Sequence, residues 1–374
     1  MSETFEIFCA VAPGLEDALS REMVEAGFSD PIVTPGGVSF EGNWQDVQRA
    51  NLVLRGAARV LARIGGFPAF HLAQLDKRAR KFPWGDFLRR DMPVRVDVVT
   101  NRKSKIYHGR AAQQRIETAL KESLGVDIGG EEALVLKARI DDNLVTFSLD
   151  TSGEPLHRRG HKVAVGKAPM RETLAALFLR ECGYCGDEPV LDPMCGSGTF
   201  LLEAAEMAVG LAPGRERSFA FEKLAGFNAA QWAEMKGSLP VGLLPPADSV
   251  RFHGSDRDSG AVGMAGKNAE RAGLAEIIDL HCAPISALER PAGPPGLVIT
   301  NPPYGARIGN KNLLYALYGS FGKVMAERFS GWRVGIVTSE PGLAKATGLP
   351  LLPPGAPVSF GSLKVQLWRT EPLP

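Results

Sequence analysis

One segment constrains the fold more than any other: a hydrophobic strand that ends in an acid and continues into a turn of small residues. Its sequence is VLDPMCGSGTF, residues 190–200. Gly196 and Gly198 allow the backbone to approach a ligand closely and to adopt positive φ. The apolar residues that follow predict a helix. A strand, turn and helix in this order favour ligand binding in the crevice at the carboxyl end of a parallel strand.

The same turn argues against two common ligands. A nucleoside-triphosphate loop needs a Lys after its last glycine, and an NAD-binding turn needs the pattern GxGxxG. Neither is present between residues 190 and 200. The alternative that remains is a tight strand-to-helix turn that binds nothing.

From residue 171 onward, short apolar strands alternate with helices. We expect strands at 189–191, 250–255, 277–281, 297–300 and 333–338, and helices at 173–180, 200–209, 260–272 and 313–329. A last hairpin is expected at 358–360 and 363–368. Such alternation predicts an α/β domain with a Rossmann-like, mostly parallel, doubly wound sheet and a terminal antiparallel hairpin.

The first 150 residues have a different pattern. Residues 1–65 follow the order β-α-β-β-α-β, which is typical of an α+β ferredoxin-like unit. Residues 66–150 predict a helix, a strand, a long helix and a hairpin. Residues 151–169 are rich in Gly, Pro, Arg and His, so we interpret them as a linker to a domain that spans 170–374.

Two further motifs follow predicted strands of the C-terminal domain. Asp256 ends the second strand, where a carboxylate can accept hydrogen bonds from two ribose hydroxyls. The strand at 297–300 continues into Asn301-Pro302-Pro303-Tyr304. The two prolines fix the backbone and remove two N–H groups, which leaves carbonyl oxygens and the Asn301 amide oxygen as acceptors. Acceptors in that arrangement suit an amino group, which has two donors.

Charge is distributed unevenly along the N-terminal half. Residues 77–115 contain twelve Lys and Arg against three acids, a net charge of +9, whereas residues 1–76 carry −5. A basic stretch beside an acidic one in a chain of net charge +1 suggests an oriented surface for a polyanion. Charge alone leaves a merely solvated face as an equal alternative.

Taken together, the three C-terminal motifs resemble those of the class I S-adenosylmethionine-dependent amino methyltransferases. The resemblance implies S-adenosyl-L-methionine as the cofactor and assigns its binding to one set of residues. That set is Asp192, Pro193, Met194, Cys195, Gly196, Ser197, Gly198 and Thr199, together with Asp256 and Arg257. The resemblance also assigns the target amine to the catalytic residues Asn301, Pro302, Pro303 and Tyr304.

The N-terminal half narrows the resemblance. SKIYH at 104–108, AQQRI at 112–116 and SLDTSGEPLHRRG at 148–160 resemble segments of THUMP-domain-containing RNA guanine-N2 methyltransferases. The chain is similar to the N-terminal half of the 23S rRNA enzyme of that family. This implies an RNA partner, ribosomal rather than transfer RNA, bound through Lys103, Lys105, Arg110 and Arg115. The sequence departs from the family at Cys282 and Ala283, where many relatives have an Asp that binds the cofactor adenine.

Other features exclude some classes of protein. No apolar run is long enough to span a bilayer, and the acidic N-terminus is unlike a signal peptide, so we expect a soluble, cytoplasmic protein without a membrane partner. Cys182 and Cys185 form a CxxC without a second pair, so we expect no metal. Three rival functions remain open: a tRNA guanine-N2 methyltransferase, a DNA adenine-N6 methyltransferase, and a non-catalytic RNA-binding assembly factor.

Overall fold

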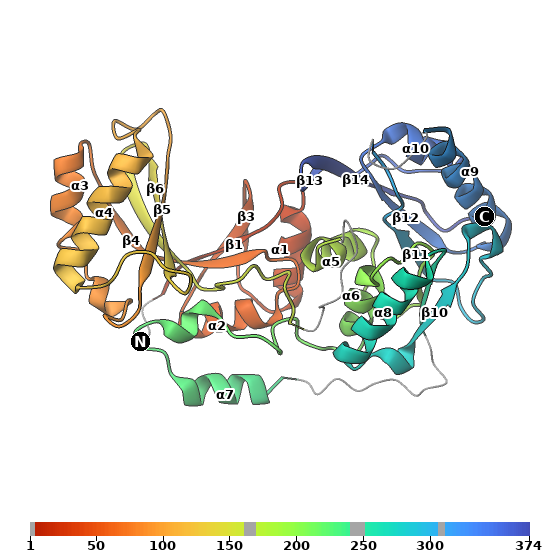
Figure 1. Cartoon of the computed structure of the whole chain (residues 1–374), viewed down its shortest axis with the longest axis horizontal. Coiled ribbons are helices and arrows are strands. Elements are labelled where there is room, and N and C mark those ends of the chain that lie inside the picture. Colours follow the sequence, from red (N-terminus) through yellow and green to blue (C-terminus); the bar gives the residue numbers. More distant parts are fainter. Residues whose placement is uncertain (1–3, 161–169, 240–250, 306–310) are drawn as a thin grey trace. The chain divides into compact units, whose positions relative to one another are not determined.

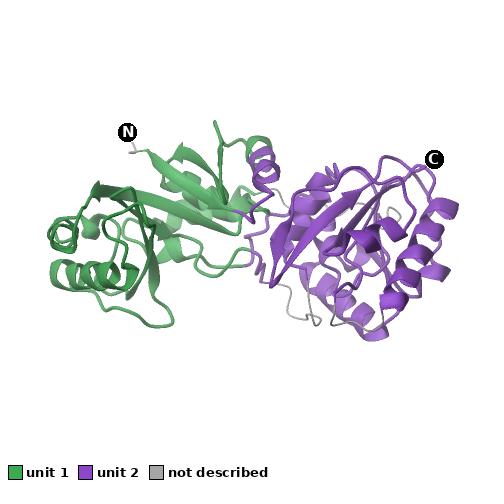
Figure 2. Ribbon diagram, turned by 90° about the horizontal axis from the view of Figure 1, so that it is seen from above, with its two compact units in different colours: residues 1–10, 23–156, 217–239 green, residues 11–22, 157–216, 240–374 purple. Residues whose placement is uncertain are grey.

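The computed structural model describes residues 4–160, 170–239, 251–305 and 311–374. The chain divides into two compact units, which do not follow the chain order strictly. Unit 1 contains residues 1–10, 23–156 and 217–239, and unit 2 contains residues 11–22, 157–216 and 240–374. Figure 2 shows the two units in different colours.

Unit 1 is built on one seven-stranded sheet with the order β2-β3-β1-β4-β7-β6-β5. All neighbouring pairs are antiparallel except β5 and β6. The strands are β1 (Phe5–Ala10), β2 (Ile32–Thr34), β3 (Gly37–Gly42), β4 (Arg59–Pro68), β5 (Val94–Thr100), β6 (Leu134–Asp141) and β7 (Leu144–Asp150). The predicted ferredoxin-like order of the first 65 residues is therefore confirmed, and its sheet continues without a break into residues 66–150.

Helices α2 (Trp44–Val53), α3 (Leu72–Ala79) and α4 (Gly109–Leu124) belong to this unit. A capping box starts α2: Asn43 Oδ1 accepts from the Gln45 N–H at 2.8 Å, and the Asp46 carboxylate accepts from the Asn43 N–H at 3.0 Å. Such reciprocal bonds satisfy the donors that a helix start leaves free. Burial alternates along β1, where Ile7 and Cys9 are fully buried, so the sheet has one covered face and one open face.

Unit 2 has a seven-stranded sheet with the order β10-β9-β8-β11-β12-β14-β13. Its strands are β8 (Val190–Asp192), β9 (Phe252–Asp256), β10 (Ile278–Cys282), β11 (Leu297–Thr300), β12 (Arg333–Thr338), β13 (Val358–Phe360) and β14 (Leu363–Arg369). The first five strands are parallel, and β14 pairs antiparallel with both β12 and β13. The predicted doubly wound sheet with its terminal hairpin is confirmed.

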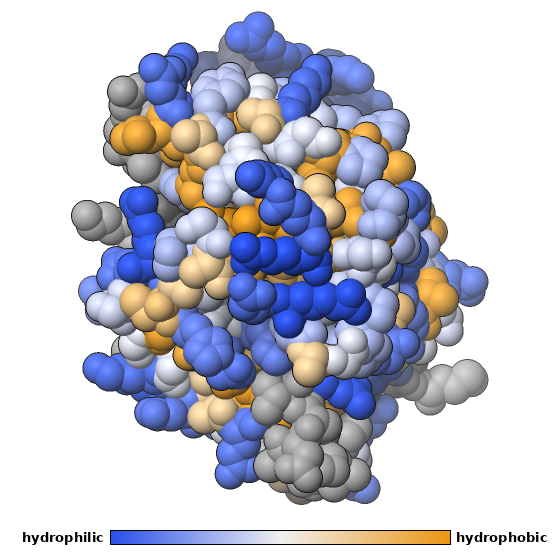
Figure 3. Space-filling model, turned by 90° about the vertical axis from the view of Figure 1, so that its right-hand side faces the viewer, coloured by the Kyte–Doolittle hydropathy of each residue, from blue (hydrophilic) through white to orange (hydrophobic). Residues whose placement is uncertain are grey.

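The helices of unit 2 are α1 (Glu16–Glu25), whose last turn belongs to unit 1, α5 (Glu172–Glu181), α6 (Thr199–Ala208), α8 (Ser259–Ala272), α9 (Lys311–Arg328) and α10 (Pro341–Ala346). Of these, α5, α6 and α8 lie on one side of the sheet and α9 and α10 on the other (Figure 1). A core of aromatic and aliphatic side chains lies between the sheet and α9, with Tyr318, Phe321 and Trp332 buried in it. The face of the molecule in Figure 3 mixes hydrophilic side chains with separated hydrophobic ones, as is usual at a protein surface.

Residues 217–239 leave unit 2 and pack on unit 1, where they include α7 (Ala229–Gly237). Arg217 fixes this excursion: its guanidinium donates to the carbonyl oxygens of Ser152, Glu154 and Pro155 at 3.2, 2.7 and 2.9 Å. The sequence pattern indicated no helix there, because only Trp232 of α7 is buried and the segment has little amphipathic signal. Among the described residues, no helix has the length and apolar character to cross a membrane.

Candidate active site

The turn after β8 has the conformation that its sequence predicts. Gly196 and Gly198 have φ values of +55° and +83°, which favour glycine. A side chain at Gly198 would also meet Ala265 of α8 at 3.2 Å. At Gly196, no atom of another described segment lies within 4 Å of the position that a side chain would occupy. The turn is therefore packed against α8 at Gly198 and open at Gly196, where a ligand could approach the backbone.

Asp192 ends β8 and lies beneath this turn, 2% exposed. Its Oδ1 accepts a hydrogen bond from the Met194 N–H at 3.1 Å. Burial raises the pKa of the Asp192 carboxyl to about 7, and the nearby charge of Asp256 contributes in the same direction. The Met194 N–H and the adjacent Thr300 hydroxyl partly oppose that shift. The carboxyl is thus an acid that a cationic or donor group of a ligand could stabilise in its charged form.

This shift gives a testable pH dependence. The carboxyl of an unfolded Asp has a pKa of about 3.9, so between about pH 4 and 7 the folded protein binds the extra proton. The free energy of unfolding should therefore fall as the pH rises through that range, by about 1.4 kcal/mol per unit of pKa difference. Asp192→Asn should remove this dependence, as measured by urea unfolding at several pH values.

The control is Asp187→Asn, which changes an exposed acid three residues before β8. Asp187→Asn should keep the wild-type pH profile. Parallel profiles for the wild-type protein and Asp192→Asn would contradict a raised pKa at Asp192.

Asp256 ends β9 and joins two turns. Its Oδ2 accepts from the Gly196 N–H at 3.1 Å, and its Oδ1 accepts from the Asp258 N–H at 3.0 Å. A backbone bond from the Cys195 N–H to the Ser255 oxygen, 2.9 Å long, binds the same two turns. Asp258 then caps α8 by accepting from Gly260 at 2.8 Å. Asp256 is only half-buried, so its carboxylate is fixed by the protein and still reachable by a ligand. Arg257, the next residue, is exposed.

The residues after β11 form the third part of the site. The Asn301 side-chain oxygen is buried and has no hydrogen-bond partner among the described residues. Pro302 is buried, and Tyr304 packs half-buried against the core that contains Tyr318. Burial raises the pKa of the Tyr304 hydroxyl to about 12, so the ring is neutral at physiological pH. A buried acceptor without a hydrogen-bond partner is costly. The Asn301 oxygen therefore indicates that a ligand supplies the missing donor group.

Sheet register brings the three turns to one edge. Asp192 pairs with Gly254, two residues before Asp256, and Thr300 lies beside Ile336 in parallel strands. Because the carboxyl ends of parallel strands meet at the same edge of a sheet, the segments from 192, 256 and 301 onward lie along one crevice. The predicted cofactor and catalytic residues are therefore brought together, whereas the predicted RNA-binding residues belong to unit 1.

Cys282 and Ala283 occupy the position where many relatives have the adenine-binding Asp, and their backbone is bonded to β9. Cys282 pairs with Asp256 across β10 and β9, and the Ala283 N–H donates to the Asp256 carbonyl at 3.0 Å. A cavity of about 710 Å³ lies against this part of the sheet, lined by Leu191, Gly254, Ala283 and Leu288 among others. His253, Asp279, His281, Glu289 and Arg290 also line it, so the cavity has both apolar and polar walls.

The same cavity contains residues that sequence reasoning missed. His281 Nε2 lies 2.8 Å from Asp279 Oδ2, and His253 Nδ1 lies 3.8 Å from the same oxygen. Burial lowers the pKa of His253 despite that carboxylate. Within the described residues no group of His, Cys, Asp and Glu has an arrangement that could hold a metal ion.

Asn268 is a second residue that sequence reasoning missed. It lies on the apolar face of α8, fully buried, and its amide donates to the Ser197 carbonyl at 3.1 Å. The bond holds the glycine turn from behind. The sequence feature that could have identified Asn268 is its place on a helix face otherwise formed by Ala261, Ala265 and Ala269.

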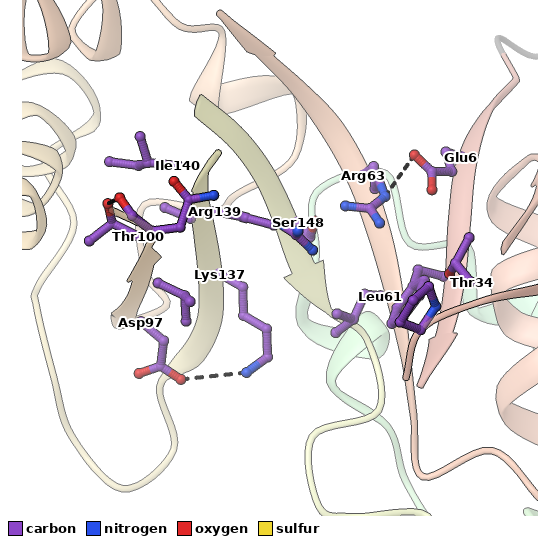
Figure 4. Close-up of a pocket in the computed structure, with 15 residues that line it drawn as sticks. Glu6, Thr34, Leu61, Arg63, Asp97, Thr100, Lys137, Arg139, Ile140 and Ser148 are labelled. Atoms are coloured by element: carbon purple, nitrogen blue, oxygen red, sulfur yellow. Dashed lines mark hydrogen bonds and ion pairs between the residues drawn. The ribbon is translucent and has the colours of Figure 1, made fainter. Parts of the chain in front are cut away.

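Lys103, Lys105, Arg110 and Arg115 are all exposed, in the loop after β5 and on α4. None of the four forms an ion pair with the described part of the chain. A separate cavity of about 700 Å³ lies on the open face of the unit 1 sheet (Figure 4). Its basic groups are paired, Arg63 with Glu6 at 2.7 Å and Lys137 with Asp97 at 3.7 Å. Arg63 and Lys137 of the cavity are therefore paired, whereas the four predicted residues have no ion pair with described residues.

Comparison with known proteins finds two matching family models. Residues 159–350 match the model described as RMKL-like, methyltransferase domain, and residues 6–61 match the model described as RlmL ferredoxin-like domain. SMU.472, assigned as a methyltransferase and solved in complex with SAH, is 26% identical with a TM-score of 0.88, and the match covers 100% of both chains.

Two further structures are similar over nearly the whole chain. A predicted N6-adenine-specific DNA methylase from Listeria monocytogenes is 29% identical with a TM-score of 0.86, covering 98% of this chain and 96% of that one. TrmN from Thermus thermophilus is 22% identical with a TM-score of 0.74, covering 99% of this chain and 100% of that one. The last similarity concerns the fold alone.

Proposed function

Because this chain belongs to the RMKL-like methyltransferase family, we propose that it methylates the exocyclic amine of guanine, N2, in 23S rRNA. Its cofactor is S-adenosylmethionine, as the fold and the relative solved with SAH indicate. The observation that carries the proposal is the buried oxygen of Asn301, at the edge where the cofactor turns meet, which has no hydrogen-bond partner among the described residues.

The residues of the crevice fit the cofactor. The open position at Gly196 allows close approach of a ligand, and the carboxylate of Asp256 is held at 3.1 Å from the Gly196 N–H while remaining half-exposed. Asp192 to Thr199 would hold the methionine part, and Asp256 the ribose. When bound, S-adenosylmethionine supplies a methyl group on a positively charged sulfur.

The chain's own part in the reaction is to position the amine. Asn301 Oδ1 and the carbonyl oxygen of Pro302 would accept the two amine protons, which orients the nitrogen lone pair away from both acceptors. Tyr304 would stack on the base, an interaction worth about 1–3 kcal/mol. The target base must leave its stack to enter the site, at a cost of a few kcal/mol that is smallest for an unpaired base. Positioning therefore accounts for most of the rate.

The choice of RNA is supported by unit 1, whose segments resemble a THUMP domain and whose four exposed cations have no ion pair with the described residues. The rival with an observation in its favour is a DNA adenine-N6 methyltransferase, because the Listeria relative is described by that activity. Both functions would use the acceptors at Asn301 and Pro302, since adenine N6 and guanine N2 are both exocyclic amines.

Incubation with labelled cofactor and total RNA, total DNA or no nucleic acid separates these functions. We expect label in RNA only, with N2-methylguanosine as the labelled nucleoside by mass spectrometry. RNA from a strain lacking the protein, separated into ribosomal and transfer fractions, should be the best acceptor in its 23S fraction. Label in DNA alone would favour the rival, and no label in either would favour a non-catalytic binding factor.

The four cations give a prediction of their own. Replacing Lys103, Lys105, Arg110 and Arg115 together with alanine should weaken RNA binding and reduce its dependence on salt. Each phosphate that is no longer neutralised by a cation lowers the slope of log affinity against log salt by about 0.7 to 0.9. The measurement is a titration of RNA at several salt concentrations.

The matched control replaces four exposed cations of unit 2 that lie outside the predicted cofactor site, Lys267, Arg271, Lys345 and Lys364, with alanine. If the two quadruple variants had equal salt slopes, the phosphate-binding residues would lie outside the loop after β5 and α4.

A further inference from the structure

Exposed apolar side chains lie on two loops of unit 1 that are bonded to one turn, and at the strand start that follows this turn. Phe70, Tyr107 and Leu144 are 45, 60 and 50% exposed. They come from three places in the sequence: the segment before α3, the loop before α4 and the start of β7. We call these three residues the aromatic corner. Apolar side chains exposed together, rather than singly, mark a surface that binds something.

The loops that present the corner are held by hydrogen bonds. Asn143 joins two of them: its carbonyl accepts from the Ala69 N–H at 2.8 Å, and its Oδ1 accepts from the Lys105 N–H at 2.8 Å. Asn101 orders the loop before α4 by accepting from the N–H groups of Lys103 and Ser104, each at 3.1 Å. Because both loops are bonded to the same turn, the backbone segments that carry Phe70 and Tyr107 are held in place.

Lys and Arg side chains lie on the loop and helix beside the corner, and the turn before Leu144 also carries the acids Asp141 and Asp142. Lys105 Nζ lies 5.4 Å from the centre of the Phe70 ring, and the Tyr107 ring lies 4.1 Å from that of His108. Lys103, Lys105 and Arg110 are exposed and form no ion pair with described residues. Aromatic faces interleaved with free cations suit a single-stranded nucleic acid, whose bases stack while its phosphates pair.

We propose that the aromatic corner binds unpaired nucleotides of the RNA substrate, with bases stacked on Phe70 and Tyr107. This rests on the proposed RNA function and adds the form of RNA that unit 1 recognises. A duplex keeps its base faces inside the stack and could use only the cations. An exposed ring beside lysines therefore favours a single strand, such as a loop or an end, over a helix.

The test compares a single-stranded oligonucleotide of about 12 nucleotides, within the usual site sizes, with a duplex of the same sequence. The single strand carries 2-aminopurine, whose emission falls when it stacks on an aromatic ring. The variants are Phe70→Leu, Tyr107→Leu and the double variant, which keep apolar side chains and all charges. The double variant should bind the single strand about tenfold or more weakly, lose the quenching, and retain the wild-type affinity for the duplex and the wild-type salt slope.

The control is Ile32→Ala, which removes an apolar side chain 62% exposed on β2 of the same unit; it should bind both RNAs as the wild type does. Wild-type affinity and quenching in the double variant would overturn the proposal, and would assign the corner to a protein partner instead. Equal losses for the single strand and the duplex would overturn it too. Methylation of DNA alone by the wild-type protein would instead reject the proposed function, whatever the corner binds.

Discussion

Replacing Asn301 with alanine should lower the single-turnover rate of methyl transfer about a hundredfold or more and leave the affinity for S-adenosylmethionine nearly unchanged. The reason is that the side-chain oxygen of Asn301 is buried without a partner among the described residues, so its partner would be the target amine. That hydrogen bond strengthens as the nitrogen becomes positive, and its loss therefore belongs to the transition state. Rates are measured on RNA with saturating protein, and cofactor binding by calorimetry.

Three further variants make the prediction specific. Asn301→Asp should lose less activity, because a carboxylate still accepts from the amine. Tyr304→Phe should keep substantial activity if the ring only stacks, whereas Tyr304→Ala should not. Near wild-type turnover by Asn301→Ala would remove this motif from catalysis and favour a binding protein without activity.

Replacing Asp256 with alanine should weaken S-adenosylmethionine binding about tenfold or more. A hydrogen bond to a charged group contributes about 1.5–3 kcal/mol, and one factor of ten corresponds to about 1.4 kcal/mol. The carboxylate also holds the Gly196 and Asp258 N–H groups, so the glycine turn loses a support in the same variant. Isothermal calorimetry with S-adenosylmethionine and with S-adenosylhomocysteine measures the loss for both forms of the ligand.

Asp258→Ala is the matched control, because it changes an exposed acid in the same turn that caps α8 through Gly260. Losing a cap costs about 1 kcal/mol of stability, and cofactor affinity should stay close to that of the wild type. An unchanged dissociation constant in Asp256→Ala would reject its role at the ribose. Equal losses in both variants would assign the effect to the turn as a whole.

Local features of the sequence determined much of this protein. The turn at Gly196 and Gly198 was predictable because positive φ is a property of single residues, and the helices and hairpins because burial repeats with a fixed period. The backbone conformation after Asn301 was likewise predictable, because each of the two prolines fixes its own φ angle. Motif resemblance then identified the family and the cofactor, since the residues that bind a ligand lie in short contiguous segments.

Some features were decided only by the tertiary structure. Asn268 supports the glycine turn from a helix about 70 residues away, and nothing near it in the sequence marks that hydrogen bond. Residues 217–239 return to unit 1 through Arg217 and the carbonyl oxygens of Ser152, Glu154 and Pro155, although they lie within the methyltransferase half of the chain. At the aromatic corner, Asn143 joins the segment before α3 to the loop before α4. In each case the interaction depends on which strands neighbour each other and on where chain connections cross, and neither is encoded in a local pattern.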